Sequence, residues 1–387
     1  MPYFNEEHHL FRESLSRFVE KEVLPCGKAW EKAGKLPASI WKKMGDQGYL
    51  GLIHEEAYGG LNADLFYSVI FLEELAKSTF GGFAGAVAVQ EYMATAHLAK
   101  TGSAFLKDKH LRPAIEGLQV AALAISEPGA GSNVAAMKTF ARKKGSQYLL
   151  SGSKIFITNG FHADYITVAA RTSEEKGTKG ISLFVVEGNS AGLSRNKLEK
   201  MGWHSSDTAE LFFDEVKVPQ ENLIGEAGQG FYYIMDSFQL ERLAIGILAS
   251  AASEKMLELS LDYMNERNVF GGPLHEIQVL RHQIARLSAE VSSLKQFIYH
   301  TAWLFGQKTN IVKECAMIKL KASELSKQVA DFCLQSFGGY GYMRDYPIER
   351  MFRDARVNTI IGGTSEIMHE IIAKCVIDKK QYRSAYA

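Results

Sequence analysis

The sequence has few cysteines and no excess of either charge. Lys plus Arg (44) equals Asp plus Glu (44), so no basic surplus is available to attract nucleic acid or an anionic membrane surface. None of the 4 cysteines forms a CxxC pair, which argues against a disulfide framework or a zinc site, and we expect no metal: they are Cys26, Cys315, Cys333 and Cys375. At 387 residues, the chain is long enough for about two to three domains.

Long apolar runs are also missing. Uninterrupted apolar stretches end at about ten residues, as in 243–252, whereas about 20 are needed to span a bilayer. The N-terminus carries Glu6 and Glu7 and lacks the basic and apolar regions of a signal peptide. The same acidic pair disfavours a mitochondrial presequence. We therefore expect a soluble, cytoplasmic protein with no membrane span.

Proline is scarce, and its 8 residues divide the chain unevenly. Before about residue 118, apolar residues recur at helical spacing, as at Phe11, Leu15 and Phe18. Short β-rich runs bounded by Gly, Ser and Asn follow at 120–125, 154–158, 165–169, 181–186 and 211–218. This change of period predicts a helical domain over 1–118 and a compact β domain over 119–228.

The last part of the chain favours long helices. Only Pro273 and Pro347 follow Gly230, so helices can continue there without interruption. Two apolar seams repeat at alternating helical spacings. One consists of Leu280, Ile284, Leu287, Val291 and Leu294, and the other of Ile311, Cys315, Ile318, Ala322, Leu325, Val329 and Phe332. The seams predict a helical bundle over 229–387, in which they form core or an oligomer interface.

Two segments rich in Gly, Ser and Asn could carry chemistry. The first, 125–133, follows a predicted strand, and its glycines would let backbone NH groups approach an anion or an oxidised ring. Taken alone it is more often an ordinary turn, since it lacks both the Rossmann spacing and the lysine of a P-loop. The second, 153–160, could be merely a half-buried strand that ends in an Asn-Gly turn.

Together and in this order, these segments and the motifs after them resemble the acyl-CoA dehydrogenase family over essentially the whole chain. Further matching motifs lie at 201–203, 206–208, 213–219, 225–230, 267–271, 335–341, 353–355 and 362–367. The resemblance implies an α+β protein with an N-terminal helical domain, a middle β-barrel-like domain and a C-terminal four-helix bundle. It also implies FAD held without a Rossmann fold, in a homo-oligomer that is usually a tetramer.

The resemblance also implies where FAD binds. The flavin ring should lie against Ile125, Ser126, Phe156 and Thr158, with the two hydroxyl groups donating to its polar edge. Gly131 and Ser132 should approach the FAD pyrophosphate or the CoA arm. Residues that correspond to contacts with the FAD of a neighbouring subunit are Arg267, Phe270, Gln278, Gln335, Gly338 and Gly339. Thr364 and Glu366 belong to a further FAD-contacting motif; outside this context, Arg267 would equally suit a surface ion pair.

The catalytic base departs from the commonest family pattern. Many relatives carry Glu directly before the Gly-Thr of the C-terminal motif, where this chain has Gly362. Long-chain and isovaleryl-type relatives instead place the base on the helix that opens the C-terminal domain, directly before an Arg, and this chain has Glu241 and Arg242 there. The resemblance therefore implies Glu241 as the base, although without it Glu241 would be interpreted as an exposed helix residue paired with a basic neighbour.

The other active-site roles implied by the resemblance belong to the backbone and to substrate contacts. The NH of Gly362 would donate to the thioester carbonyl, so the missing side chain need not remove that site. Ser132, Arg242 and Gly363 would contact the acyl-CoA substrate.

The implied function is FAD-dependent oxidation of an acyl-CoA thioester to trans-2-enoyl-CoA, as in fatty acid β-oxidation, most like the long-chain subgroup. The electron acceptor would be an electron-transfer flavoprotein. One alternative is the same oxidation of a branched, terpenoid or carrier-protein-bound acyl thioester, because Gly362 leaves room beside the reacting carbons. Another is a non-catalytic, acyl-CoA-binding helical scaffold.

Overall fold

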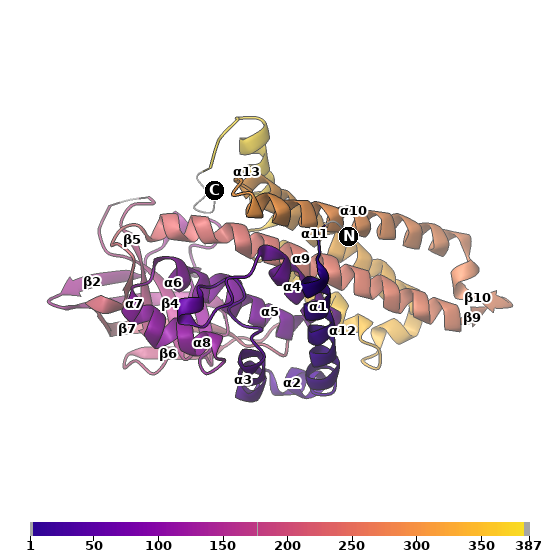
Figure 1. Ribbon diagram of the computed structural model, residues 1–387, viewed down its shortest axis with the longest axis horizontal. Coiled ribbons are helices and arrows are strands. Elements are labelled where there is room, and N and C mark those ends of the chain that lie inside the picture. The colour runs from indigo at the N-terminus through magenta and orange to yellow at the C-terminus, as the bar shows by residue number, and fades with distance from the viewer. Residues whose placement is uncertain (1–2, 176, 383–387) are drawn as a thin grey trace.

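The computed structural model describes residues 3–175 and 177–382, in which a helical region, a sheet and a set of long helices follow one another along the chain (Figure 1). The sheet lies at one end of the molecule. The helix α9 (Gly230–Glu266) runs from it to a small hairpin at the other end. The predicted α+β architecture is confirmed, while the boundaries at 118/119 and 228/229 stay predictions.

One helix of the N-terminal region is buried on nearly all sides, because it packs against α9 as well as against short helices of its own region. That helix, α4, contains the consecutive buried residues 68–76, so its apolar surface packs against several neighbours at once. Asp64 caps it by accepting a hydrogen bond from the NH of Phe66. The helices are α1 (Glu6–Phe18), α2 (Gly27–Ala33), α3 (Ala38–Asp46), α4 (Leu65–Lys77), α5 (Gly81–Val89), α6 (Thr95–Thr101), α7 (Ala104–Leu106) and α8 (Arg112–Ile115).

Eight strands of the described chain form one mixed sheet in the order β6–β7–β3–β2–β4–β5–β8, with β1 parallel to β4. The strands are β1 (Ala121–Ala124), β2 (Phe140–Lys144), β3 (Gln147–Thr158), β4 (Tyr165–Arg171), β5 (Ile181–Glu187), β6 (Leu193–Lys197), β7 (Thr208–Pro219) and β8 (Leu223–Ile224). Each predicted β-rich run corresponds to a strand. The sequence did not predict β2, β6 or the two-residue β8. The side chains of β2 and β6 are mostly polar and exposed and break the apolar pattern.

The C-terminal region is a bundle of long helices with two shorter ones. Beside α9 it contains the hairpin strands β9 (Asn268–Val269) and β10 (Gly272–Pro273), then α10 (Gln278–Gly306), α11 (Val312–Ser336), α12 (Ile348–Ala355) and α13 (Ser365–Val376). The two predicted seams lie along α10 and α11, and Leu287, Val291, Cys315 and Ile318 are buried. The helices α9 to α12 share one hydrophobic core with α1, α4 and α5, so the two helical regions fold against each other.

One buried carboxylate joins all three regions. Asp354 in α12 accepts hydrogen bonds from the NH of Trp203, at 2.6 Å, and from the NH of Gly81, at 3.1 Å. Trp203 precedes β7 and Gly81 begins α5, so one side chain links the sheet to both sets of helices. Among the described residues, no helix is both long and apolar enough to cross a membrane.

Candidate functional site

The end of β1 and the end of β3 lie together and carry the predicted flavin-ring residues. The NH of Ile155 donates to the carbonyl oxygen of Ser126 at 3.0 Å, which brings the loop after β1 against β3. The pairing of β3 with β7 is irregular between Lys154 and Ile157. At this bulge Phe156 has a φ of 63° and leaves 69% of its surface exposed. The bulge therefore presents an aromatic side chain outward beside Ser126 and Thr158.

The loop between β1 and β2 is tight at its base and open at its tip. Glu127 and Ala130 exchange two backbone hydrogen bonds of 3.0 Å each. Gly131 and Ser132 follow and are exposed, and a Cβ placed on Gly131 would have no neighbour within 4 Å. The loop thus leaves room for a bound group to approach its backbone closely.

Glu241 in α9 faces Gly362, in the turn before α13. A Cβ placed on Gly362 would lie 3.3 Å from Oε1 of Glu241 and would collide with Cδ1 of Ile245. Gly362 and Gly363 have φ angles of 62° and 93°, which residues with side chains rarely adopt. The turn can therefore approach Glu241 only because both residues are glycine.

The surroundings of Glu241 make its carboxyl a weaker acid than usual. Burial raises the pKa of Glu241 to about 7, although the positive charges of Arg242 and Lys319 oppose this shift. Lys319, on α11, is fully buried and its Nζ donates to the carbonyl oxygen of Gly363 at 2.5 Å. Burial lowers the pKa of Lys319 to about 8. Lys319 thus connects the glycine turn electrostatically to the candidate base.

The other residues of this group lie around the same turn. Arg242 is only 7% exposed, and its guanidinium carbon lies 5.3 Å from the ring centroid of Phe238. Thr364 caps α13 by accepting from the NH of Ile367 at 3.4 Å. Glu366 is exposed in the first turn of α13. The structure therefore brings Glu241, Arg242 and the residues 362–366 together.

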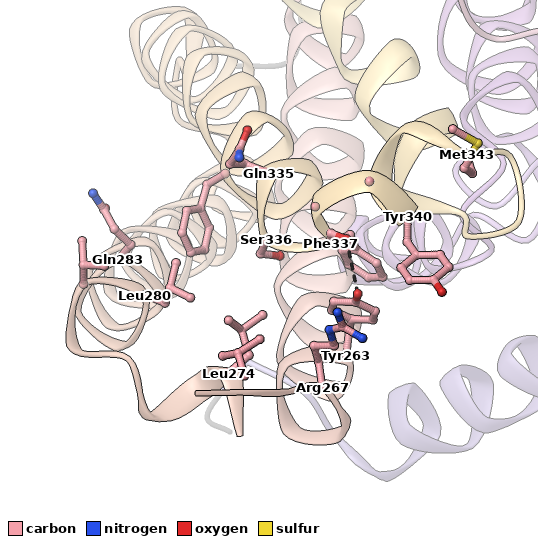
Figure 2. A pocket seen from close by; sticks show the side chains of 15 residues that line it. Tyr263, Arg267, Leu274, Leu280, Gln283, Gln335, Ser336, Phe337, Tyr340 and Met343 are labelled. Atoms are coloured by element: carbon pink, nitrogen blue, oxygen red, sulfur yellow. Dashed lines mark hydrogen bonds between the residues drawn. The ribbon is translucent and has the colours of Figure 1, made fainter. Parts of the chain in front are cut away.

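A second group of predicted residues lines a cavity of about 880 Å³ at the far end of the bundle (Figure 2). Arg267 at the end of α9, Gln335 near the end of α11, and Gly338 and Gly339 after α11 all contribute to its wall. Phe270 lies fully exposed in the turn of the adjacent hairpin, and the exposed Gln278 begins α10. These six residues, predicted from separate motifs, thus lie at one end of the molecule.

The cavity wall also contains residues that the sequence did not indicate as FAD contacts. Its apolar wall includes Tyr263, Leu274, Leu280, Tyr340 and Met343 (Figure 2). Tyr263 packs on Phe337 with ring centroids 4.2 Å apart and donates its hydroxyl to the carbonyl oxygen of Phe337 at 3.3 Å. Leu280 belongs to a predicted apolar seam and so suited ordinary helix core, and only the position of Tyr340 within the 335–341 motif and of Met343 just after it could have indicated the cavity.

Within one chain, the second group lies far from Glu241. Arg267 follows the last residue of α9, about 39 Å along the helix axis from Glu241 at about 1.5 Å per residue. The hairpin that follows Arg267 and the sheet that carries Phe156 lie at opposite ends of the molecule (Figure 1). Within residues 3–175 and 177–382, no group of three or more His, Cys, Asp or Glu side chains is placed to hold a metal ion.

Family models match all three regions of the chain. The acyl-CoA dehydrogenase N-terminal domain matches residues 5–118, the middle domain matches 122–216 and the C-terminal domain matches 228–377. This chain belongs to the acyl-CoA dehydrogenase family. Membership confirms the family resemblance and the prediction of a flavin-dependent oxidoreductase that acts on acyl-CoA.

Known members of the acyl-CoA dehydrogenase family match the chain over nearly its whole length. The mitochondrial long-chain specific acyl-CoA dehydrogenase of Sus scrofa is 40% identical over 97% of this chain and 88% of its own length. A crystal structure of acyl-CoA dehydrogenase from Geobacillus kaustophilus is 42% identical, with a TM-score of 0.93 over 97% of this chain and 99% of that chain. A Mycobacterium smegmatis glutaryl-CoA dehydrogenase in complex with FADH2 is 26% identical, with a TM-score of 0.92 over 99% of this chain and 97% of that chain.

Proposed function

We propose that the protein oxidises an acyl-CoA thioester to the trans-2-enoyl-CoA, with FAD as cofactor and Glu241 as the catalytic base. The observation that carries this proposal is the placement of Glu241 directly against the Gly362 turn, where burial raises the pKa of its carboxyl to about 7. A base of this pKa is ionised at neutral pH in a large fraction of molecules and still holds a proton well once it has accepted one.

The local features of the structure fit FAD. Phe156 is exposed at the bulge and can lie against one face of a flavin ring, while the open loop at Gly131 and Ser132 leaves room for a phosphate or a CoA arm. The cavity at Arg267 combines an apolar wall with a guanidinium, as the adenosine and pyrophosphate parts of FAD require. When bound, FAD supplies the acceptor for the hydride that leaves the β-carbon of the substrate.

The residues of this chain supply the proton transfer and the charge stabilisation. Glu241 takes the proton from the α-carbon, and the electron pair of that C–H bond forms the new double bond as the hydride leaves. The NH of Gly362 would donate to the thioester oxygen, where negative charge develops. Lys319 stabilises the turn by binding the Gly363 carbonyl oxygen. Arg242 is nearly buried, which leaves little of its side chain exposed to a ligand, and its contact with CoA stays a prediction.

We expect activity to rise with pH through about 7. Glu241 can accept a proton only when ionised, and its carboxyl is protonated below its raised pKa of about 7. The pH profile of kcat/KM, measured with an artificial electron acceptor, should therefore show an acidic limb with a midpoint near this value. A profile that stays flat between about pH 5.5 and about pH 8.5 would contradict the assignment.

A Lys319→Met variant tests one of the positive charges that oppose the raised pKa of Glu241. The positive charge of Lys319 lowers the pKa of Glu241, so removing it should move the acidic limb to higher pH. The matched control is Lys321→Met, because Lys321 is exposed on the same helix and pairs with Glu290 at 2.9 Å. This control should leave the limb in place.

We further propose that Arg267 and the cavity contact the FAD bound mainly by a second copy of the chain. Along α9, Arg267 lies about 39 Å from Glu241, whereas the flavin must reach the substrate beside Glu241. The complete site would therefore need at least a dimer, and we expect the tetramer usual in the family. An electron-transfer flavoprotein remains our proposed acceptor.

Arg267→Gln should weaken FAD binding by roughly ten- to a hundredfold. A hydrogen bond to a charged group contributes about 1.5–3 kcal/mol, and about 1.4 kcal/mol corresponds to a tenfold change in affinity. The dissociation constant can be measured by fluorescence titration of the apoprotein with FAD. Arg286→Gln is the control, since Arg286 is an exposed α10 residue that pairs with Glu290 outside the cavity. Equal FAD affinities of both variants would exclude a role of Arg267.

The identity of the acyl group is a separate question, because the same site chemistry suits linear, branched, terpenoid and carrier-bound thioesters. We propose a linear long-chain acyl-CoA as the preferred substrate, given the similarity to long-chain specific relatives. Anaerobic bleaching of the flavin with a panel of these thioesters tests this choice. Rapid bleaching by the branched members alone would overturn it.

A further inference from the structure

A buried ion pair lies directly behind the segments that carry Ser126 and Phe156. The Nζ of Lys154 lies 2.9 Å from Oε1 of Glu127, and the two side chains are 0% and 6% exposed. Lys154 is on β3, two residues before Phe156, and Glu127 directly follows Ser126. The charged pair therefore stands next to both halves of the proposed flavin-ring site.

The pair is the centre of a network that joins three segments of the chain. Lys154 also donates to the carbonyl oxygen of Ile125 at 2.9 Å. Glu127 accepts from the backbone NH groups of Lys138, at 2.6 Å, and Thr139, at 2.9 Å. The network thus connects the end of β1, the segment before β2 and the bulged part of β3.

Both groups of the pair are kept charged at neutral pH. Burial alone would raise the pKa of Glu127, but Lys154 and the NH donors outweigh burial and lower it. Burial lowers the pKa of Lys154 to about 8, against the opposing effect of Glu127. Such a pair contributes little net stability compared with a well-packed apolar pair, whereas removing one partner leaves a buried charge unpaired. Stability alone therefore does not account for a charged pair at this place.

We propose that Lys154 and Glu127 form a positioning pair that sets the geometry of the flavin-ring site. By holding the Ile125 carbonyl and the Glu127 carboxylate, Lys154 determines how the loop with Ser126 lies against the strand with Phe156 and Thr158. The backbone hydrogen bond from the NH of Ile155 to the carbonyl oxygen of Ser126 also holds the loop against the strand. This inference rests on the proposed function, because it assumes that these side chains contact the flavin.

The first test compares Lys154→Met with the double variant Lys154→Met/Glu127→Leu. The single variant leaves Glu127 buried without its cation and should be less stable, whereas the double variant removes both charges and should regain much of the melting temperature. If the pair positions the loop, the double variant should still bind FAD roughly ten- to a hundredfold more weakly than the wild type, the range found when a residue that orients a metal ligand is lost. It should also show a shifted midpoint potential of the bound flavin and a changed visible absorption band.

The matched control is Arg12→Met, which breaks another partly buried ion pair far along the chain. Arg12 binds Glu73 and Glu74 at 2.7 Å each, and these residues join α1 to α4. This variant should lose stability but keep the FAD affinity, the absorption band and the midpoint potential of the wild type.

The outcomes separate the inference from the proposed function. A double variant with wild-type FAD affinity, absorption and potential would overturn the positioning role, since apolar packing would then suffice. The same double variant with restored melting temperature but altered flavin properties would support it. A wild-type protein that is colourless, and stays so with added FAD, would overturn the proposed function and this inference with it.

Discussion

Glu241→Gln should retain bound FAD and lose turnover by roughly two to four orders of magnitude, the range that a positioned general base contributes. Gln has nearly the volume of Glu, so the packing against the Gly362 turn should persist, but its amide cannot accept the α-proton. Anaerobic bleaching of the flavin by an acyl-CoA in a single turnover measures the chemical step directly. The visible spectrum of the same sample reports whether the FAD site is intact.

A matched control for this variant lies on the same helix. Glu254 is a partly exposed α9 residue that pairs with Lys295 at 2.8 Å and lies well beyond the turn at Gly362. Glu254→Gln should bleach at the wild-type rate. Near-normal bleaching of the Glu241→Gln variant would eliminate Glu241 as the base and leave the proton transfer to another group.

Moving the carboxylate from Glu241 to residue 362 should restore part of the lost activity. A Cβ on Gly362 would lie 3.3 Å from Oε1 of Glu241, so we expect a glutamate side chain there to enter the volume that Glu241 now occupies. That volume must first be vacated, which makes Glu241→Ala a better background than Glu241→Gln. Ile245→Val should be added, because Cδ1 of Ile245 would collide with the new Cβ. The flavin of the triple variant Glu241→Ala/Ile245→Val/Gly362→Glu should bleach faster than that of Glu241→Ala/Ile245→Val.

The same geometry predicts what Gly362→Glu does alone. Gly362 has a φ of 62°, where a residue with a side chain costs about 1–2 kcal/mol, and the new side chain would meet Glu241 in place. We expect this variant to be less stable and almost inactive, as measured by thermal unfolding and by bleaching. A triple variant no faster than its Glu241→Ala/Ile245→Val parent would show that residue 362 does not reach the substrate carbon that Glu241 reaches.

Much of the fold follows from local patterns in the sequence. The seam residues of α10 and α11 repeat at helical spacing because one side of each helix is buried, and the runs in β4 and β5 are apolar because those strands are buried on both faces. The strands β2 and β6 could not be predicted in this way. Their exposed polar side chains are typical of loops. These segments are strands because neighbouring strands supply their hydrogen-bond partners.

Site residues divide along a similar line. Glycine at position 362, where many relatives have glutamate, and the Glu241-Arg242 pair can be read directly from the motifs. The sequence therefore already indicates which helix should carry the base. The contact between Glu241 and the Gly362 turn, the buried Lys319 beside them and the apolar wall of the cavity are not visible. Each depends on side chains that are far apart in the chain and whose spacing suits ordinary helix core.

By itself, the sequence determined the family, the order of its helical and sheet regions and the residue types available for catalysis, because motifs and hydrophobic periods are local properties of the chain. Only the tertiary structure decided which of these residues meet. It placed Glu241 against Gly362, tied Lys154 to Glu127 behind the segments predicted to contact the flavin ring, and separated Arg267 from Glu241 by most of α9. Burial and distance arise only when distant segments pack, and they set both the pKa of the base and the proposed need for a second subunit.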